Sequence, residues 1–251
     1  MTHKKIPNEC PYCKAPLEVC NCDEIKALNY KELKSQFQDK LVLKCSNYPK
    51  CDSYVVFPQT MSASERGVVA NKFLRNLRSV THRICDLIWK TGMVRGRDKL
   101  YELLSKQLKI NSGKSHIRFY DLFDCIDAIL FAFEYINAGF PKINFLCLSK
   151  LDEAESDMLR KIVKTEFTVQ KKYDFSKNDL ETILSIIYND DVKKVFNVNI
   201  NRSICSFIKN REIVVYSYEG TTLHECVKSI TVQLYNDFAH MYGFPKINKY
   251  I

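Results

Sequence analysis

The sequence predicts an α+β protein in three parts: a cysteine-rich β module at residues 1–62, a basic helical segment at 63–138 and a mixed α/β domain at 139–251. Six of the 11 cysteines fall within the first 51 residues, apolar residues then recur at helical spacing, and the last third alternates strand-like with helix-like runs. The chain has 251 residues, of which 46% are hydrophobic, so it can bury a sizeable core, and this excludes a disordered protein.

The N-terminal cysteines are spaced as metal ligands, in a C-x-x-C knuckle followed by a longer, turn-rich second knuckle. The four predicted ligands are Cys10, Cys13, Cys45 and Cys51. Four thiolates favour a tetrahedral zinc ion with Zn–S distances of about 2.3 Å. Apolar runs at 41–43 and 54–57 flank the second knuckle as strands, a pattern typical of a zinc ribbon. We therefore expect one structural Zn²⁺ with no open position for catalysis.

A second choice of ligands is open at this stage. Cys20 and Cys22 lie between the two knuckles, and with the first knuckle they would make a compact four-cysteine loop. We favour the knuckle at 45–51, because only it is flanked by predicted strands. Cys20 and Cys22 then have no assigned role.

The central segment predicts three helices. From 65 to 90 the apolar residues repeat at helical intervals, and the basic residues gather on the opposite face. A second helix is expected over 97–109, and a third, capped by Asp121, is expected to run to Ile136.

Beyond residue 139 the pattern predicts strands mixed with helices. The expected strands are 143–148, 195–200, 203–208 and 212–218, and the expected helices are 152–167, 178–188 and 221–240.

The positive charge of the chain is concentrated in its centre. Residues 66–118 carry 13 basic and 3 acidic side chains, a net charge of +10, whereas the whole chain has +9. A basic helical face beside a zinc ribbon favours contacts with a phosphate backbone.

The candidate nucleic-acid contacts are Lys72, Arg75, Arg78, Arg83, Lys90, Arg95 and Arg97. Tyr12, Tyr48, Tyr54 and Phe57 are candidates for stacking on unpaired bases. Core packing is the favoured alternative for Tyr54 and Phe57, and Tyr48, at a knuckle tip, is the best candidate for exposure. The alternative interpretation of the basic helical face is that it is simply exposed to solvent and binds no partner.

Two features together resemble a known family. The first is the pair of knuckles, C-P-Y-C and 45–55, and the second is a series of downstream motifs. The downstream motifs are His82–Lys90, Gly92–Arg95, Tyr101–Leu104 and His116–Asp121. Their order resembles the zinc-finger-containing domain family of bacteriophages and prophages, over about residues 8–135. The resemblance implies zinc and a phage origin but no reaction. The ribbon is also similar to the C-terminal zinc ribbons of bacterial type I topoisomerases, which bind single-stranded DNA.

The chain departs from that family in two places. A long insert between the knuckles carries Cys20 and Cys22, and Ser115 stands where the family tends to have a cysteine. Any role of that cysteine is not carried over to this chain.

No motif predicts a reaction. His224 and Glu225 begin like a zinc-protease helix, but Lys228 stands where the second histidine is required. The acidic cluster from Asp152 to Asp157 falls at a predicted helix start, where the helix dipole favours acids. We expect a phage-encoded, non-catalytic protein that binds DNA or RNA in viral transcription or replication. The alternatives are an inhibitor or adaptor of a polymerase or defence enzyme and, less favoured, a metal-dependent nuclease.

The sequence also carries an expectation about location. The longest clean apolar run, 128–133, is far shorter than the roughly 20 residues of a membrane helix. The N-terminus has no apolar signal core, and the scattered later cysteines are typical of free thiols in a reducing compartment. We expect the host cytoplasm.

Overall fold

The computed structural model describes residues 8–25, 38–62, 65–139, 151–164, 177–188, 199–201, 204–209, 212–217 and 223–247. By its internal contacts the chain divides into two compact units. Unit 1 comprises Met1–Asn76 and Leu234–Asn248, and unit 2 comprises Leu77–Gln233 and Lys249–Ile251. Helices α2 (Lys72–Lys90) and α9 (Leu223–Tyr242) each belong partly to both units. The three-part division expected from the sequence stays a prediction.

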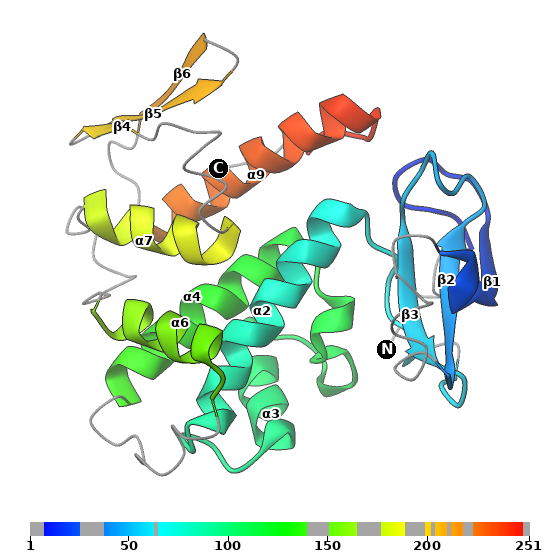
Figure 1. Cartoon of the computed structure of the whole chain (residues 1–251), viewed down its shortest axis with the longest axis horizontal. Coiled ribbons are helices and arrows are strands. Elements are labelled where there is room, and N and C mark those ends of the chain that lie inside the picture. The colour runs from blue at the N-terminus through cyan, green and yellow to red at the C-terminus, as the bar shows by residue number, and fades with distance from the viewer. Residues whose placement is uncertain are drawn as a thin grey trace. The chain divides into compact units, whose positions relative to one another are not determined.

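Unit 1 is built on a small antiparallel sheet, in which the strands follow the order β1-β2-β3 (Figure 1). The strands are β1 (Leu17–Asn21), β2 (Lys40–Cys45) and β3 (Tyr54–Pro58), and a short helix, η1 (Cys22–Glu24), follows β1. Strands β2 and β3 confirm the expected pair around the second knuckle. Strand β1 was not predicted, because its sequence, L-E-V-C-N, lacks a clean run of β-branched or aromatic residues.

The sheet of unit 1 carries a thin core on each face. One cluster contains Cys22, Ile25, Val42 and Tyr54, and the other contains Leu43, Val55, Phe57 and Val69. Neighbouring residues Val42 and Leu43 serve opposite faces because side chains alternate along a strand. Cys20 packs against the first cluster, so both cysteines of the insert act as small hydrophobic side chains there.

The C-terminal part of the chain completes unit 1. The ring of Phe73 lies 5.6 Å from that of Tyr235 and 5.7 Å from that of Phe238. The Asn236 side-chain amide bonds to both backbone groups of Ile247, at 2.8 and 3.1 Å. These contacts hold the end of α9 and the segment after it within the ribbon's unit.

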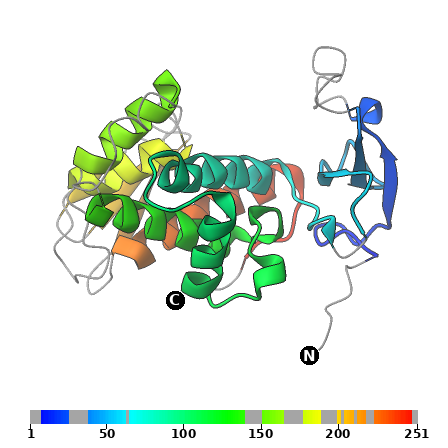
Figure 2. The same cartoon turned by 90° about the horizontal axis from the view of Figure 1, so that it is seen from below.

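Unit 2 is mainly helical. Besides the larger parts of α2 and α9 it contains α3 (Arg97–Leu108), η4 (Ser112–Lys114), η5 (Ile117–Phe119), α4 (Leu122–Gly139), α6 (Glu153–Lys164) and α7 (Lys177–Tyr188). Helices α2 and α4 run side by side, with Cys85 Sγ 3.7 Å from the Ala128 carbonyl oxygen (Figure 2). The core contains large, fully buried side chains from these helices, including Ile84, Leu100, Ile126 and Phe133.

The expected helices are confirmed with shifted ends. Asp121 caps α4 as predicted, since its Oδ1 accepts from the backbone N–H groups of Phe123 and Asp124. Helix α2 begins at Lys72 rather than at residue 65. The reason is a pair of backbone hydrogen bonds between Ala70 and Tyr54, at 3.1 and 3.2 Å, which hold residue 70 as a bridge beside β3.

A second antiparallel sheet lies in the C-terminal half, with the order β4-β5-β6. Its strands are β4 (Asn199–Asn201), β5 (Ile204–Lys209) and β6 (Glu212–Ser217), close to three of the expected positions. The expected strand 143–148 lies outside the described residues. With helices and small sheets, the protein is α+β as predicted. None of the described helices has the length and apolar character of a membrane span.

Candidate metal centre

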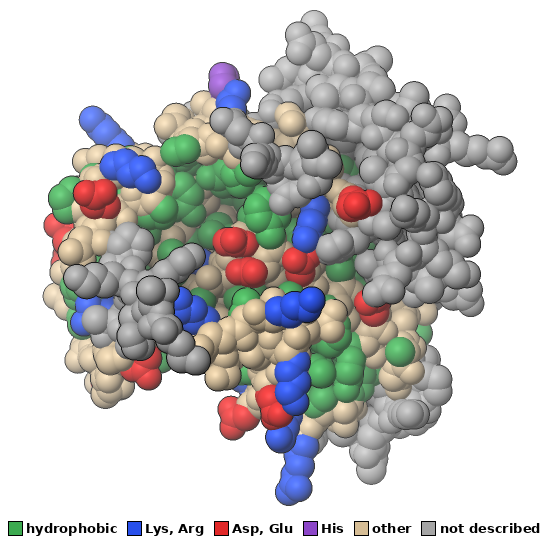
Figure 3. Space-filling model, turned by 180° about the vertical axis from the view of Figure 1, so that it is seen from behind, with side chains coloured by type: hydrophobic (Ala, Val, Ile, Leu, Met, Phe, Trp, Pro, Cys, Tyr) green, Lys and Arg blue, Asp and Glu red, His purple; other side chains and the backbone are tan. Residues whose placement is uncertain are grey.

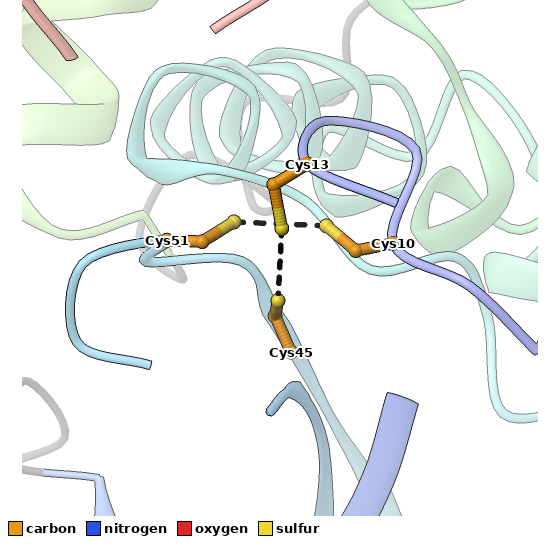
Figure 4. Close-up of side chains that lie close together, drawn as sticks. All are labelled: Cys10, Cys13, Cys45 and Cys51. Atoms are coloured by element: carbon orange, nitrogen blue, oxygen red, sulfur yellow. Dashed lines mark hydrogen bonds between the residues drawn. The ribbon is translucent and has the colours of Figure 1, made fainter. Parts of the chain in front are cut away.

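The four predicted cysteine ligands meet at one point in unit 1 (Figure 4). Their Sγ atoms all lie within 4.8 Å of one another. The Sγ atoms of Cys10 and Cys51 are 3.6 Å apart, and those of Cys13 and Cys45 are 3.3 Å apart. A tetrahedral zinc ion with Zn–S bonds of about 2.3 Å requires S–S distances of about 3.8 Å. The two shortest distances are slightly below this value and none of the others exceeds 4.8 Å, so the four sulfurs fit one zinc ion.

The first knuckle is shaped by its own backbone. The Cys10 N–H donates to the Ala15 carbonyl at 2.8 Å, and the Lys14 N–H donates to the Cys10 carbonyl at 3.0 Å. Lys14 has φ of 63°, in the left-handed region that reverses the chain tightly. The turn therefore leaves both knuckle sulfurs on the same side.

The second knuckle begins at the end of β2. The Tyr48 N–H donates to the Cys45 carbonyl at 3.0 Å, and the Cys51 N–H donates to the Asn47 carbonyl at 3.1 Å. Strand β1 leads out of the first knuckle and pairs with β2 so that Leu17 lies opposite Cys45. The strand that sequence patterns missed is thus the one that brings the two knuckles together.

Polar neighbours support the sulfurs. Ser53 Oγ lies 3.3 Å from Cys51 Sγ, and the Asn47 side-chain amide donates to Cys13 Sγ at 3.7 Å. Such bonds orient metal ligands and stabilise their thiolates. Sequence reasoning missed both residues, because nothing in the cysteine spacing marks them.

The protonation of the thiols is strongly perturbed. Burial raises the pKa of Cys45 and raises that of Cys51 to about 11. Burial also acts to raise the pKa of Cys13, but hydrogen bonds from the Ala15 backbone and from the neighbouring cysteines outweigh it and lower the pKa to about 7. Four clustered thiolates therefore need a bound cation to offset their charge and desolvation.

The alternative ligand pair, Cys20 and Cys22, does not lie in the four-cysteine cluster. The Cys22 thiol is buried and donates to the Lys40 carbonyl at 3.5 Å, and burial raises the pKa of Cys20 to about 11. Among the residues that the structure describes, the four knuckle cysteines are the one group placed to hold a metal ion. All four positions are filled by protein sulfur, so the zinc is structural.

A cysteine cluster on a three-stranded sheet fits a zinc ribbon, and the fold and site together define a zinc-binding protein. A family model described as a zinc-finger-containing domain matches residues 6–134, just over half of the chain. The chain belongs to this family, and it holds one structural Zn²⁺ through the four knuckle cysteines. Neither the curated proteins nor the solved structures contain a significant match.

Two of the predicted nucleic-acid contacts are built into the fold instead of facing solvent. Arg75 donates to the Asp52 carboxylate at 3.3 Å, and its guanidinium lies 3.8 Å from the centre of the Tyr54 ring. Arg78 is buried and donates through Nε and Nη2 to the Tyr120 carbonyl, at 2.8 and 2.6 Å. Their charges hold the protein's own backbone and side chains in place.

The remaining candidates divide into paired and unpaired side chains. Lys90 forms an ion pair with Glu155, and Arg97 forms one with Asp86 at 2.8 Å. Three candidates are exposed and have no acidic partner among the described residues. These are Lys72, Arg83 and Arg95. On the face shown in Figure 3, basic and acidic side chains are interspersed.

All four candidate stacking residues contact the protein itself, and Tyr54 and Phe57 are buried in the core of unit 1. The ring of Tyr12 lies 5.5 Å from that of Phe244, and the ring of Tyr48 lies edge-on to Tyr54 at 6.4 Å. Sequence reasoning could not place Phe244 beside the knuckle, because 230 residues lie between it and Cys13.

The acidic cluster is explained by helix capping and ion pairing. The Glu155 N–H donates to the Asp152 carboxylate at 2.7 Å at the start of α6, and Asp157 pairs with Lys161 at 3.0 Å. Lys228, in the incomplete protease motif, pairs with Asp127 at 2.6 Å. These side chains have structural partners and form no metal-binding group within the described residues.

Proposed function

We propose that this protein is a non-catalytic, zinc-stabilised nucleic-acid-binding protein whose contact surface is the metal end of the ribbon. The observation that carries the proposal is a set of exposed lysines beside the knuckles. Lys14 follows one ligand, Lys50 precedes another, and the backbone N–H of Lys72 donates to the Asp52 carboxylate at 3.0 Å. Each lysine is next to a knuckle ligand or is bonded to the residue that follows one, so its exposed side chain can meet a phosphate backbone beside the zinc site.

The local charge balance supports this assignment. Asp52, the acid beside the second knuckle, is already paired with Arg75. Glu18 and Glu24 are paired with Lys44. The exposed lysines at the knuckles therefore keep their positive charge, with Glu9 as the exposed acid beside the first knuckle.

The test is a fluorescence-anisotropy titration of the zinc-loaded full chain with single- and double-stranded oligonucleotides at several salt concentrations. The test variant combines Lys14→Gln, Lys50→Gln and Lys72→Gln. Each lost phosphate contact lowers the salt slope by about 0.7–0.9, so the slope should fall by about 2–3 and binding should weaken roughly tenfold or more. Arg75 and Arg78 are unsuitable for this test, because their loss disturbs the fold.

A matched control removes the same charge from exposed lysines of unit 2. The control variant combines Lys99→Gln, Lys106→Gln and Lys161→Gln, whose side chains are 64%, 74% and 47% exposed. Equal weakening by both variants would show that binding follows net charge and not the knuckles. Absence of binding to any oligonucleotide at low salt would refute the proposal.

A second candidate is a protein-interaction factor, such as an inhibitor or adaptor of a polymerase or defence enzyme. The observation in its favour is the internal use of Arg75, Arg78, Lys90 and Arg97, which leaves a smaller exposed basic surface than the sequence suggests. Retention of a purified polymerase on the immobilised protein after nuclease treatment would support it. If nuclease treatment abolishes the retention, the result would support the nucleic-acid-binding proposal instead. For either candidate, a role in phage transcription or replication is part of the proposal.

A further inference from the structure

The C-terminal segment, residues 243–247, lies against the first zinc knuckle. It follows α9 and belongs to unit 1 together with the knuckle. The ring of Phe244 lies 5.5 Å from that of Tyr12, which stands between the ligands Cys10 and Cys13 in the sequence. Residues from opposite ends of the chain therefore meet beside the zinc site.

The C-terminal segment is firmly held in unit 1. The Phe244 N–H donates to the Ala239 carbonyl at 2.8 Å, which is the closing bond of a Schellman motif at the end of α9. The ring of Phe238 lies 5.9 Å from that of Phe244, and the Asn236 amide bonds to both backbone groups of Ile247. Phe244 is therefore a fixed support for the ring of Tyr12.

Of these two rings, Tyr12 is the outer one. Phe244 is only 7% exposed, whereas Tyr12 is partly exposed. The other candidate stacking residues are less well placed, because Tyr54 and Phe57 are buried and Tyr48 packs against the first cluster of the sheet. Tyr12 is thus the stacking candidate best placed to meet a ligand from solvent.

Each partner of this contact brings an exposed lysine. Lys14 follows Tyr12 by two positions, and its Nζ donates to the Pro11 carbonyl at 3.4 Å. Lys246 is exposed in the C-terminal segment. Neither lysine has an acidic partner among the described residues, and Glu9 is the exposed acid beside this knuckle. An aromatic ring accompanied by positive charge is the combination that binds unpaired nucleotides.

We propose that the first knuckle and the C-terminal segment together bind an unpaired stretch of nucleic acid, with a base stacked on Tyr12 and phosphates at Lys14 and Lys246. Phe244 is a positioning residue, since it supports the stacking ring from inside. This inference rests on the proposed function, and it adds the class of ligand and a contact from the far end of the chain. A duplex offers phosphates to the lysines, but its paired bases are not available to Tyr12.

The experiment measures the fluorescence anisotropy of three labelled probes with the zinc-loaded full chain. The probes are a short single strand, the duplex of the same sequence, and an abasic strand of the same length, which keeps the phosphates and lacks the bases. Stacking of one base raises affinity roughly fivefold or more, so the single strand should bind more tightly than the abasic strand by that factor.

The variant that tests stacking is Tyr12→Leu, which keeps an apolar contact with Phe244 and removes the aromatic ring. It should weaken binding of the single strand roughly fivefold or more, and it should leave the abasic strand and the duplex unchanged. Tyr135→Leu, at a partly exposed position of α4 in unit 2, is the matched control and should change none of the three affinities. One zinc per chain by elemental analysis shows that each variant keeps the ribbon.

The variant that tests the C-terminal segment is Lys246→Gln. Loss of one phosphate contact should lower the salt slope for the single strand and the abasic strand by about 0.7. Lys161→Gln, at an exposed position of α6 in unit 2, is its matched control and should leave the slope unchanged.

The outcomes separate this inference from the proposed function. Equal affinities for the single and abasic strands, equal weakening of all three probes by Tyr12→Leu, or an unchanged slope with Lys246→Gln would overturn the inference and leave the proposed function standing. Absence of binding to any probe at low salt would refute both.

Discussion

The two units of this protein solve the problem of stability differently. In the described part of unit 1 the sheet carries two thin clusters of four buried residues each, beside four cysteine sulfurs placed to hold a metal. Unit 2 buries whole faces of its helices, and nine side chains of α4 alone lie in the core. A small sheet cannot remove enough apolar surface from water to fold unaided, whereas a packed helical unit can. The comparison predicts that unit 1 needs the zinc to fold and that unit 2 does not.

The basic residues of α2 show the same contrast within one helix. Arg75, in unit 1, fastens the chain after the second knuckle by bonding to Asp52. Arg78, one turn later and in unit 2, satisfies the Tyr120 carbonyl before α4. Two arginines one turn apart on the same helix thus stabilise different units of the protein.

Removal of the zinc should have the largest effect and should fall on unit 1. Zinc binding in small modules supplies about 10–16 kcal/mol of coupled folding free energy, so chelation or Cys45→Ser should unfold β1, β2 and β3. Amide hydrogen exchange measured by mass spectrometry should become fast in these strands. The fluorescence of Trp89, the single tryptophan and a residue of unit 2, should stay that of the folded protein.

Cys20→Ser is the matched control for the metal ligand, because Cys20 packs in the ribbon but lies outside the zinc site. It should keep one zinc per chain by elemental analysis, whereas Cys45→Ser should lose it. A shift of Trp89 emission to that of the unfolded chain on chelation would break the comparison, since unit 2 would then depend on the metal.

Replacement of Arg78 should have an intermediate effect on unit 2. Arg78→Met keeps the apolar part of the side chain but leaves the buried Tyr120 carbonyl without its donor. The free energy of unfolding should fall by about 2–3 kcal/mol in a urea titration followed by Trp89 fluorescence. Arg83→Met, at an exposed position of the same helix, should change it by less than about 0.5 kcal/mol. Equal effects would mean that the buried arginine is not structural.

Lowering the pH should have the smallest of the three effects on stability. With Trp89 fluorescence as the probe, the measurement reports the stability of unit 2. Burial, with Arg118 next, lowers the pKa of His116 to about 3, while an unfolded histidine titrates near 6.5. Below pH 6.5 the unfolded chain takes up a proton that the folded chain refuses, so stability should fall as the pH drops from 6.5 toward 3. Above pH 6.5 this group should have no effect. His116→Gln should make the dependence on pH shallower in urea titrations, and an unchanged slope would contradict the assignment.

Much of the fold could be predicted from local sequence. The knuckle spacing and the flanking strands favoured the four ligands, the apolar periodicity predicted the helices, and Asp121 predicted the start of α4. These signals are local because a turn, a cap or a helical face is set by residues a few positions apart. Strand β1 and the start of α2 were not predictable, because each is fixed by pairing with a distant strand.

The sequence by itself predicted the zinc site, because cysteine spacing together with the flanking strand-like runs favoured Cys45 and Cys51 over Cys20 and Cys22 as partners of the first knuckle. It also determined the α+β class, because the spacing of apolar residues within each segment indicates a helix or a strand. Only the tertiary structure decided which positive charges remain available and which side chains complete each unit. No local pattern distinguishes Arg75, Arg78 and Tyr12 from side chains that face solvent. In the structure each of them contacts a partner that is distant in the sequence. A side chain's surroundings depend on residues far along the chain, and no local pattern contains that information.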